Sequence, residues 1–489
     1  MIIATAGHVD HGKTKLIEAI TGVNSDRLPE EKNRGMSIDL GFAYHDLGNG
    51  VILNFIDVPG HERFINNLLS GFSNVDLGLL VIAADDGPMP QTVEHLSILQ
   101  LLQVKNCIIV LTKIDKVNQK RLDNVCCLIK KMMHKTIFSD AEIFHISNKT
   151  SQGIDNLVSH LKIIALNYHH KEVKGNFRLS VDRRFLVKGA GIVITGTVVS
   201  GEVSVGEELI HSKSGESLKI RAIHSQSKKS KNGIQGHRCS LNITGQKITI
   251  DKISRGDWIL SKNVFFVTNR LDAVLSILKN EKKIFKHWTA IHLYLGSGNV
   301  TGRIAILGSF SINPGEKKIV QLVLDKPVHA VFDDKFVIRD ISSSRTIGGG
   351  YILDPFAKKN NNTNFRSFRS ERLKLISPNS SKIVLNNLLL HYIEGIDLNY
   401  FLMSRNLTAS EFEKIIEPLD IVIELYKKHK WLILKTNWIC LQKIILDKLL
   451  KKDQPLSGQG MELNTILKAI KLNVPNFVVQ NILNKSLKS

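Results

Sequence analysis

The stretch that decides the fold is Gly7-His8-Val9-Asp10-His11-Gly12-Lys13-Thr14, which matches the phosphate-loop pattern G-x-x-x-x-G-K-[ST]. An apolar run at residues 2–6 precedes it and an amphipathic stretch at 13–20 follows it, so we expect the loop between a strand and a helix. Loop N–H groups and the helix N-terminus bind phosphate oxygens. We expect Lys13 to reach the β- and γ-phosphates and Thr14 to ligate Mg²⁺. A metal-binding pair of His8 and His11 is the alternative, but the phosphate loop already explains the segment.

A second motif, Asp57-Val58-Pro59-Gly60-His61, ends a predicted strand at 51–56. An aspartate at this place can hold the Mg²⁺ shell, so Asp57 joins Thr14 as a candidate metal ligand. Gly60 lets the backbone approach the γ-phosphate. The motif therefore predicts the triphosphate end of the site.

A third motif, Thr112-Lys113-Ile114-Asp115, ends a predicted strand at 107–111 and indicates a guanine pocket. The Asp115 carboxylate can accept hydrogen bonds from guanine N1–H and the 2-amino group, and adenine offers neither donor. The aliphatic part of Lys113 can lie along the base, and Ser147 is placed to lie beside guanine O6. All residues from Gly7 to Thr14 are expected to bind GTP, together with Asp57, Pro59, Gly60, Thr112, Lys113, Asp115 and Ser147.

Hydrolysis of GTP needs an oriented water more than a strong base. His61 directly follows Gly60, so we assign it that catalytic role; the alternative is a structural histidine on a mobile loop. The segment 34–39 lies between the phosphate loop and Asp57, and its Ser37 hydroxyl is expected to complete Mg²⁺ coordination only in the triphosphate state. The sequence thus predicts a GTPase with GTP or GDP and Mg²⁺.

Strands alternate with helices over residues 1–170, which predicts an α/β domain with a mostly parallel sheet. Short β runs broken by glycine follow, which predict two antiparallel β-barrels at 175–262 and 263–356. A polar linker at 357–369 leads to a helical region. The order of helices and a hairpin at 370–445 is that of a winged helix, although a plain helical cap is equally compatible. Residues 446–489 are interpreted as part of a second such module.

Length, hydropathy and cysteine usage restrict the class of protein. The chain has 489 residues, 43% of them hydrophobic, which suits several globular domains. No apolar run reaches the roughly 18 residues of a membrane span, and the N-terminus lacks the regions of a signal peptide. The five cysteines form no C-x-x-C pair, so neither a zinc site nor a redox motif is indicated. We expect a cytoplasmic monomer with no membrane partner.

The formal net charge of +21 lies almost entirely beyond residue 174. Two interpretations are equally open from charge alone. One is a compositional drift towards lysine and asparagine with solvated charges. The other is a polyanionic partner held by the later domains.

At these motifs the chain resembles the translational GTPases, and within them the bacterial selenocysteine-specific elongation factors. The resemblance rests on residues 7–14, on Arg34-Gly35-Met36-Ser37-Ile38-Asp39 and on residues 57–61. It is supported by Leu28-Pro29-Glu30-Glu31-Lys32, Asp85-Asp86-Gly87 and Val187-Lys188-Gly189-Ala190-Gly191, and by threonine at position 112, where elongation factor Tu usually has asparagine. It covers residues 1 to about 354 and weakens beyond.

The resemblance implies a factor that binds GTP, carries selenocysteyl-tRNA to the ribosome and decodes UGA codons marked by an mRNA hairpin. It also places the pair of residues flanking the catalytic water on Val9 and Met36, and a selenocysteyl pocket on Asp182, Arg183 and Arg238. The chemistry is sensible, because a selenol ionises well below a serine hydroxyl and two guanidiniums favour the anion. The alternative for these three residues is a surface ion pair and a barrel-exposed arginine.

Three departures from the family pattern stand out. Position 37 is Ser where the family usually has Thr, and the guanine loop Ser147-Asn148-Lys149 matches only loosely. The family typically ends in four winged-helix modules, the last two of which grip the hairpin, and too few residues follow 369 for that. We therefore expect the mRNA hairpin as a partner only through the shortened extension. The alternatives are a general aminoacyl-tRNA carrier and a non-catalytic RNA-binding relative.

Overall fold

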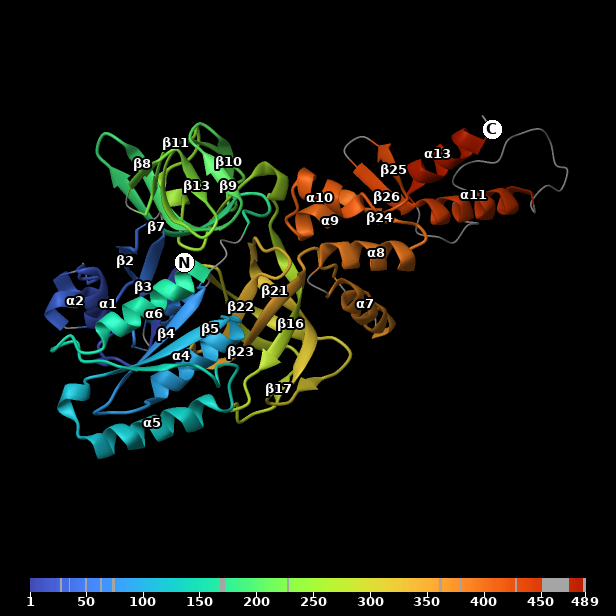
Figure 1. Cartoon of the computed structure of the whole chain (residues 1–489). Coiled ribbons are helices and arrows are strands. Elements are labelled where there is room, and N and C mark those ends of the chain that lie inside the picture. Colours follow the sequence, from blue (N-terminus) through green and yellow to red (C-terminus); the bar gives the residue numbers. More distant parts are fainter. Residues whose placement is uncertain are drawn as a thin grey trace. The chain divides into compact units, whose positions relative to one another are not determined.

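The computed structural model describes residues 1–489 except 27–28, 35, 49–50, 62–63, 73–74, 168–171, 227, 360–362, 378–379, 427–428, 451–474 and 487–489. Its contacts divide the chain into two units, Met1–Ala357 and Lys358–Ser489 (Figure 1). Among the described helices, none combines the length and the apolar character that crossing a membrane requires.

A mostly parallel sheet forms the N-terminal domain, with strand order β2-β3-β1-β4-β5-β6. Only β2 runs antiparallel to its neighbour, β3. The strands are β1 (Ile2–Ala6), β2 (Gly41–Asp46), β3 (Ile52–Asp57), β4 (Leu77–Ala83), β5 (Asn106–Thr112) and β6 (Ile143–His145). The helices are α1 (Lys13–Thr21), α2 (Pro29–Arg34), α3 (Ile65–Phe72), α4 (Pro90–Leu101), α5 (Gln119–Met133) and α6 (Ile154–Asn167).

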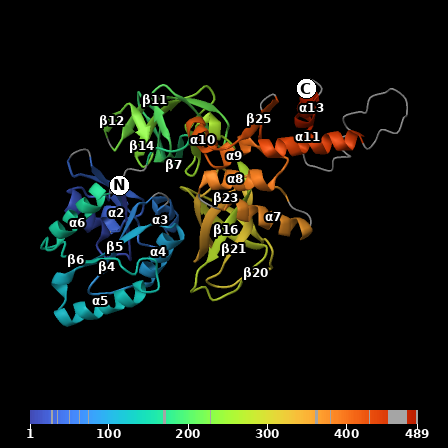
Figure 2. The same ribbon diagram turned by 45° about the vertical axis from the view of Figure 1, so that its right-hand side comes forward.

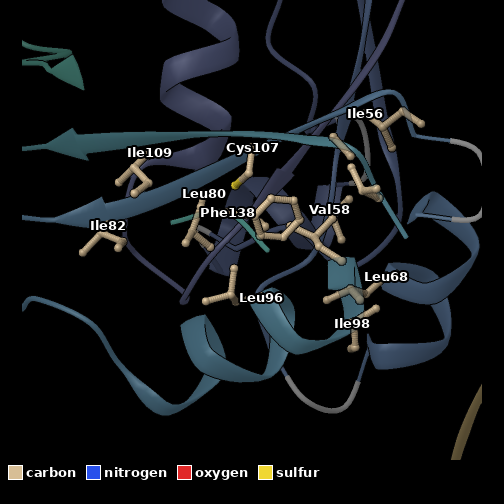
Figure 3. Packing of buried hydrophobic residues seen from close by; sticks show 14 of the residues in the cluster. Ile56, Val58, Leu68, Leu80, Ile82, Leu96, Ile98, Cys107, Ile109 and Phe138 are labelled. Carbon is tan, nitrogen blue, oxygen red and sulfur yellow. The ribbon is translucent and has the colours of Figure 1, made fainter. Parts of the chain in front are cut away.

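Apolar layers cover both faces of this sheet. On one face, Leu16 and Ile17 of α1 pack with Leu157 and Leu161 of α6. On the other face, side chains of α3, α4 and α5 pack against the strands; Figure 3 shows this layer, with Leu96 and Ile98 of α4 near the sheet. The carboxyl ends of β1, β3 and β5 carry the loops that begin at positions 7, 58 and 113, so buried strands position all three sequence motifs.

The first barrel is an antiparallel sheet with strand order β10-β15-β7-β8-β14-β11-β12, which a further pairing of β10 with β11 closes. Its interior is apolar, with Leu179, Ile194 and Leu241 fully buried. The strands of this sheet are β7 (Arg178–Val187), β8 (Gly191–Ser200), β10 (Glu208–His211), β11 (Ser217–Ser225), β12 (Lys228–Ser230), β14 (Arg238–Thr244) and β15 (Trp258–Leu260). A separate two-stranded sheet pairs β9 (Glu202–Ser204) with β13 (Asn232–Ile234).

The second barrel is closed in the order β16-β21-β19-β18-β22-β23, with β17 and β20 paired at one end. Its strands are β16 (Thr268–Ile277), β17 (Phe285–Lys286), β18 (Thr289–Leu295), β19 (Gly298–Ile306), β20 (Ser311–Ile312), β21 (Lys317–Val328), β22 (Lys335–Asp340) and β23 (Thr346–Asp354). Short 3₁₀ turns lie at Ile114–Lys116, Ile250–Lys252 and Lys262–Val264.

Buried arginines tie the second barrel to its two neighbours. Arg339 of β22 donates to the Glu94 carboxylate of α4 over 2.5 Å, and Thr346 Oγ1 donates to the same carboxylate over 2.9 Å. Arg178 of the first barrel forms a bidentate ion pair with Asp334. These bridges satisfy charges that would otherwise be buried without partners.

The second unit holds α7 (Thr363–Ile376), α8 (Ser381–His391), β24 (Ile396–Asp397), α9 (Leu398–Ser404), α10 (Ala409–Ile416), β25 (Ile421–Tyr426), β26 (His429–Leu434), α11 (Lys435–Leu450) and α13 (Asn476–Ser486). Figure 2 shows the labelled helices of this unit from a second direction. The order from α8 to β26 is the one expected of a winged helix, and that assignment stays a prediction. Residues 451–474 of the predicted second module lie outside the described residues, and α13 contributes Val478, Val479 and Ile482 to a core with Trp438 of α11.

The predicted fold class is confirmed: an α/β domain, two β-barrels and a helical C-terminal region. The sequence did not predict α2 or β2. The β2 strand is short and lies at the edge of the sheet, so its place depends on antiparallel pairing with β3 rather than on a strong local pattern.

Candidate functional site

The phosphate loop joins β1 to α1 in a conformation that requires glycine. Gly7 has φ of +133°, and a Cβ there would lie 2.2 Å from the Val81 carbonyl oxygen. The Gly7 N–H donates to His95 Nδ1 over 2.9 Å, and His95 is fully buried, which lowers its pKa well below the ordinary value. The ring is therefore neutral and can accept this hydrogen bond. Because His95 belongs to α4, this helix stabilises the phosphate loop.

Lys13 lies inside the curve of the loop. Its Nζ donates to the Gly7 carbonyl over 3.1 Å and to the His8 carbonyl over 2.6 Å. Burial lowers the pKa of Lys13 to about 8, although Asp57, Asp10 and Asp26 act in the opposite direction. A buried ammonium with only neutral acceptors in direct contact is suited to bind an anion such as a phosphate.

The residues around the loop fit a nucleotide. Within the described residues, His8 Nδ1 and Asn148 Oδ1 are buried polar atoms without a hydrogen-bond partner. Buried polar atoms in proteins are nearly always paired, so such atoms indicate a missing ligand or water. The phosphate loop and the guanine loop thus both present unsatisfied groups to the same site.

Oxygen ligands gather where Mg²⁺ is expected. Asp57 is fully buried and accepts hydrogen bonds from Thr5 Oγ1 (3.0 Å), Thr14 Oγ1 (2.7 Å) and Ser25 Oγ (2.5 Å). Ser37 Oγ lies 3.0 Å from Thr14 Oγ1. The structure therefore brings together all three sequence-predicted ligands, and hydroxyl and carboxylate oxygens suit this hard cation.

Two residues beside this cluster escaped the sequence analysis. Ser37 Oγ donates to Asp26 Oδ1 over 2.8 Å, and Ser25 holds Asp57. Burial raises the pKa of Asp26, which the hydrogen bond from Ser37 partly counters. The dipeptide Ser25-Asp26 carries no motif, so only the folded chain reveals its place.

Gly60 lies directly against the phosphate loop. A Cβ at Gly60 would lie 2.5 Å from Lys13 Nζ and 2.8 Å from the Val9 amide nitrogen. Pro59 before it is buried, and the half-buried ring of His61 follows, with its centroid 6.0 Å from that of Phe64. Val9 N–H donates to Gln91 Oε1 over 3.4 Å. The catalytic role of His61 and the flanking role of Val9 and Met36 stay predictions.

The guanine pocket is built from the ends of β5 and β6. Ser147 Oγ donates to Asp115 Oδ1 over 2.6 Å, and this hydrogen bond lowers the pKa of Asp115, so the carboxylate is held ionised and oriented. Lys113 has φ of +56°, and its Nζ lies 3.3 Å from Asp85 Oδ2. The Asp115 carboxylate is therefore a fixed acceptor, as the predicted guanine contact requires, and that contact stays a prediction.

Two links join the guanine pocket to the phosphate loop. Thr112 Oγ1 donates to the His11 carbonyl over 2.7 Å, and Asn148 Nδ2 donates to the Gly12 carbonyl over 3.3 Å. Thr112 thus uses a hydroxyl to stabilise the loop. In the sequence Asn148 belongs only to a loose match to the guanine motif, whereas in the structure it makes a defined contact with the phosphate loop. His11 is buried, which lowers its pKa to about 4, so its ring is neutral. Among the described residues no group of three or more His, Cys, Asp or Glu side chains is placed to hold a metal ion, so the alternative pair of His8 and His11 has no further ligands there.

The three predicted pocket residues of the first barrel gather around one aromatic ring. Asp182 accepts two hydrogen bonds from Arg238, at 2.9 and 2.8 Å, and Thr195 Oγ1 donates to Asp182 over 2.6 Å. The guanidinium of Arg238 lies 3.8 Å from the ring centroid of Phe42, and that of Arg183 lies 5.7 Å from it. Asp182 thus orients Arg238 rather than its neighbour Arg183.

Arg183 instead bridges to the α/β domain. It donates to Asp39 Oδ2 over 2.6 Å and to the Leu40 carbonyl over 2.7 Å. No sequence motif includes Arg255, which donates a hydrogen bond to Asn67 of α3. Burial lowers the pKa of Arg255, and the nearby charges of Asp39, Asp182 and Arg183 also affect that pKa. The cluster therefore lies at the junction of two domains, and neither Phe42 nor Arg255 belongs to a motif that could have revealed it.

Two protein families match this chain. Residues 1–166 match "Elongation factor Tu GTP binding domain", and residues 272–359 match "Selenocysteine-specific elongation factor, beta-barrel domain". The matched segments carry the nucleotide site and most of the second barrel.

Curated relatives extend the likeness over more of the chain. The selenocysteine-specific elongation factor of Escherichia coli (strain K12) is 41% identical over 353 residues, which are 72% of this chain and 55% of that protein. The factor of Haemophilus influenzae is 36% identical over 425 residues, 86% of this chain and 66% of that protein. The factor of Methanocaldococcus jannaschii is 30% identical over 321 residues, 64% of this chain and 68% of that protein. The chain thus spans little more than half of the first relative.

Solved structures agree with these relatives. The crystal structure of a bacterial selenocysteine-specific elongation factor, EF-Sec, matches with a TM-score of 0.79 and 29% identity, over 99% of this chain and 77% of that one. Elongation factor SelB from Methanococcus maripaludis, in complex with the GTP analogue GppNHp, matches with a TM-score of 0.62 and 27% identity, over 73% of this chain and 79% of that one.

Proposed function

This chain belongs to the selenocysteine-specific elongation factors, and from that premise we propose that it is a GTPase that carries selenocysteyl-tRNA to the ribosome for UGA decoding. Hydrolysis of GTP to GDP and phosphate would release the tRNA. The observation that supports the cargo is the placement of Arg183 and Arg238 around Phe42, at the junction of the α/β domain and the first barrel.

The proposed steps at the nucleotide site follow from the contacts. Lys13 binds the β- and γ-phosphates, Asp115 selects guanine, and the Gly60 backbone contacts the γ-phosphate. Bound Mg²⁺ would neutralise the phosphate charge, held through Thr14, Ser37 and Asp57. His61 orients the attacking water once the ribosome positions its loop. Departure of the γ-phosphate frees Ser37, and the switch segment relaxes.

The proposed pocket distinguishes amino acids by charge. A selenocysteyl side chain is an anion at neutral pH, whereas serine and most others are not, and Arg238 is already oriented by Asp182. Two nearby guanidiniums stabilise the anion, and the Phe42 ring limits access of water. The basic charge beyond residue 174 then serves the phosphates of the tRNA, so binding should weaken steeply with salt.

Binding of the same tRNA charged with selenocysteine or serine tests this function. We expect the GTP-loaded protein to protect the selenocysteyl ester from hydrolysis at concentrations where the seryl ester is unprotected. Equal protection of both esters would favour the general aminoacyl-tRNA carrier. GTP turnover that does not rise with added ribosomes would favour the non-catalytic RNA-binding relative.

The unit Lys358–Ser489 is the proposed contact for an mRNA hairpin. Binding of the full GTP-loaded chain to the UGA-flanking hairpin, at fixed salt, is compared with a loop-mutated hairpin. Loop-specific binding supports this contact, and equal or absent binding overturns it. We also propose that the chain is a cytoplasmic monomer. The molar mass of the tRNA complex, measured by light scattering, checks the monomeric state.

A further inference from the structure

One end of the second barrel exposes a group of large apolar side chains, which we call the tip cluster: Ile284, His287, Trp288 and Phe310. Ile284, Trp288 and Phe310 are 54%, 47% and 76% exposed. The His287 ring lies 6.1 Å from each of the Trp288 and Phe310 rings, stacked on the first and edge-on to the second. The three rings of the cluster are therefore connected through His287, and Ile284 adds exposed apolar surface from the same segment as Trp288.

The tip cluster lies away from the first barrel. Trp288 precedes β18, and the turn after the other end of β18 contacts the first barrel, where Ser297 Oγ lies 2.6 Å from Ser180 Oγ. Figures 1 and 2 agree, since β17 and β20 lie at the end of the second barrel opposite the first. The hydrogen bonds and ring contacts given above for the nucleotide site and the arginine cluster come from other residues of the described part of the chain.

The backbone holds Trp288 outward under strain. Its φ of +66° is in the left-handed region, which costs about 1 kcal/mol or more for a residue other than glycine. The Trp288 N–H donates to the Ile304 carbonyl over 2.7 Å, and its carbonyl accepts from Arg303 over 3.2 Å. A bulky ring in a position suited to glycine, with its indole exposed to solvent, is typical of a binding residue.

The charge around the cluster is positive. Lys282, Lys283, Lys286 and Arg303 are exposed, and residues 282–290 and 300–312 contain no acidic side chain. The adjacent carboxylate of Glu281 is bound by Arg345. Aromatic faces flanked by cations bind unpaired nucleotides, because the bases stack on the rings and the cations contact the phosphates. A protein partner would require an apolar surface but not this excess of positive charge.

We propose that the tip cluster binds an unpaired nucleotide of the carried tRNA, with its base against Trp288 or Phe310 and its phosphates near Lys286 and Arg303. The choice of tRNA rests on the proposed function, since tRNA is the polyanion that the barrels would hold. The contact is independent of the amino acid, because the tip cluster is separate from the arginine cluster. This contact would increase the affinity of the chain for tRNA, because tRNA has unpaired bases that can stack on the rings and a fully paired stem has none.

The experiment uses the fluorescence of Trp288 in the full chain with deacylated tRNA. The chain has four tryptophans, of which Trp258 and Trp438 are buried and Trp431 is half-buried, so Trp288 is the exposed one. We expect tRNA to quench this fluorescence and a fully paired RNA of equal length to bind with much less quenching. Trp288→Gly suits the left-handed backbone, so the fold should persist, while tRNA affinity falls about tenfold and the quenching is lost.

Matched variants separate stacking from charge. Val267→Ala changes an exposed apolar residue just before β16, at the opposite end of the same barrel, and should leave tRNA binding unchanged. Lys286→Gln should lower the salt dependence of binding but preserve the quenching. Unchanged tRNA affinity in Trp288→Gly, equal quenching by the paired RNA, or quenching by ribosomes but not by tRNA would each overturn the proposal. Quenching by deacylated tRNA, together with equal protection of the selenocysteyl and seryl esters, would overturn the proposed cargo and support the tip cluster.

Discussion

Arg183 of the first barrel donates to Asp39 of the α/β domain over 2.6 Å, and Asp39 lies only two residues after Ser37 of the Mg²⁺ cluster. The same segment continues to Phe42, whose ring lies under Arg183 and Arg238. One stretch of chain therefore contacts both the metal cluster and the proposed pocket. A change at Ser37 after hydrolysis would shift the partner of Arg183.

The first prediction concerns Asp39→Asn. Loss of the carboxylate weakens the charge-assisted hydrogen bond that positions Arg183, so selenocysteyl-tRNA affinity of the GTP form should fall about tenfold. GTP affinity should stay unchanged, as should the weak binding of the seryl ester. Glu94→Gln is the matched control, because it breaks an acid–arginine bridge to the second barrel without contacting Phe42. An equal loss of selenocysteyl-tRNA affinity in both variants would mean that weakened docking between domains, and not a change in the pocket, lowers the affinity.

Asp115→Asn should change base selectivity. The amide cannot accept from both guanine donors, so GDP affinity should fall roughly a hundredfold. Xanthosine diphosphate should bind better than before, since xanthine has a carbonyl where guanine has the amino group and can accept from the new amide. Titration with both nucleotides measures the switch, and Asp155→Asn in the first turn of α6 is the control. If the ratio of the two affinities stayed constant, Asp115 would not contact the base.

Gly60→Ala should discriminate GTP from GDP. The added Cβ would lie 2.8 Å from the Val9 amide nitrogen, which is backbone and can only move by distorting the phosphate loop. We expect GTP affinity and turnover to fall at least about tenfold, with GDP affinity little changed, because Gly60 is predicted to contact the γ-phosphate, which GDP lacks. In the control Gly233→Ala, the nearest atom is Cys239 Sγ at 3.2 Å, remote from the nucleotide. Parallel losses of GTP and GDP binding would contradict the role of Gly60 at the γ-phosphate.

Buried neutral histidines should make the fold sensitive to acid. Burial, with Arg178 adjacent, holds the pKa of His329 well below its ordinary 6.5, and His329 Nε2 accepts from Arg178 Nε over 2.9 Å. Below pH 6.5 the unfolded chain takes up a proton that the folded chain excludes, so the free energy of unfolding falls as pH falls. Between pH 7 and 5.5 this amounts to about 1 kcal/mol for one such group.

Denaturant unfolding at several pH values measures this dependence. His329→Gln should give a shallower decline between pH 7 and 5.5, although it lowers stability at pH 7 through its lost contacts. His224→Gln, at an exposed position of the first barrel, should leave the slope unchanged. A slope that His329→Gln does not alter would show that other groups control the acid sensitivity.

Ile482→Ala tests whether α13 completes the core of the second unit. Ile482 is fully buried in a cluster with Trp438, so its truncation should reduce the stability of this unit by about 3 kcal/mol. Ile439 of α11 is 46% exposed, and Ile439→Ala should change stability by well under 1 kcal/mol. Two of the four tryptophans, Trp431 and Trp438, lie in this unit, so its unfolding in urea contributes to the change in tryptophan fluorescence. Equal effects of the two substitutions would mean that α13 is not part of the folded core.

Local patterns were sufficient for the α/β domain and the barrels, because hydrophobic periodicity and glycine placement are encoded within a few residues. The same patterns predicted Thr14, Ser37 and Asp57 as a set, and the structure brings these three together. They did not predict β2 or the contacts of Ser25 and Asp26. The position of β2 and the contacts of Ser25 and Asp26 depend on which segments pack against the end of β3, and no short sequence motif predicts that packing.

Short local patterns were sufficient to identify the phosphate loop and the guanine motif, and the change from helical to β periodicity along the chain was sufficient for the order of domains. The tertiary structure alone decided that Asp182 pairs with Arg238, that Arg183 pairs with Asp39, and that Phe42 lies under both arginines. Arg183 and Asp39 are 144 residues apart, and an ion pair at such separation exists only because two domains dock. Docking depends on summed shape and charge over whole surfaces, which local sequence does not specify.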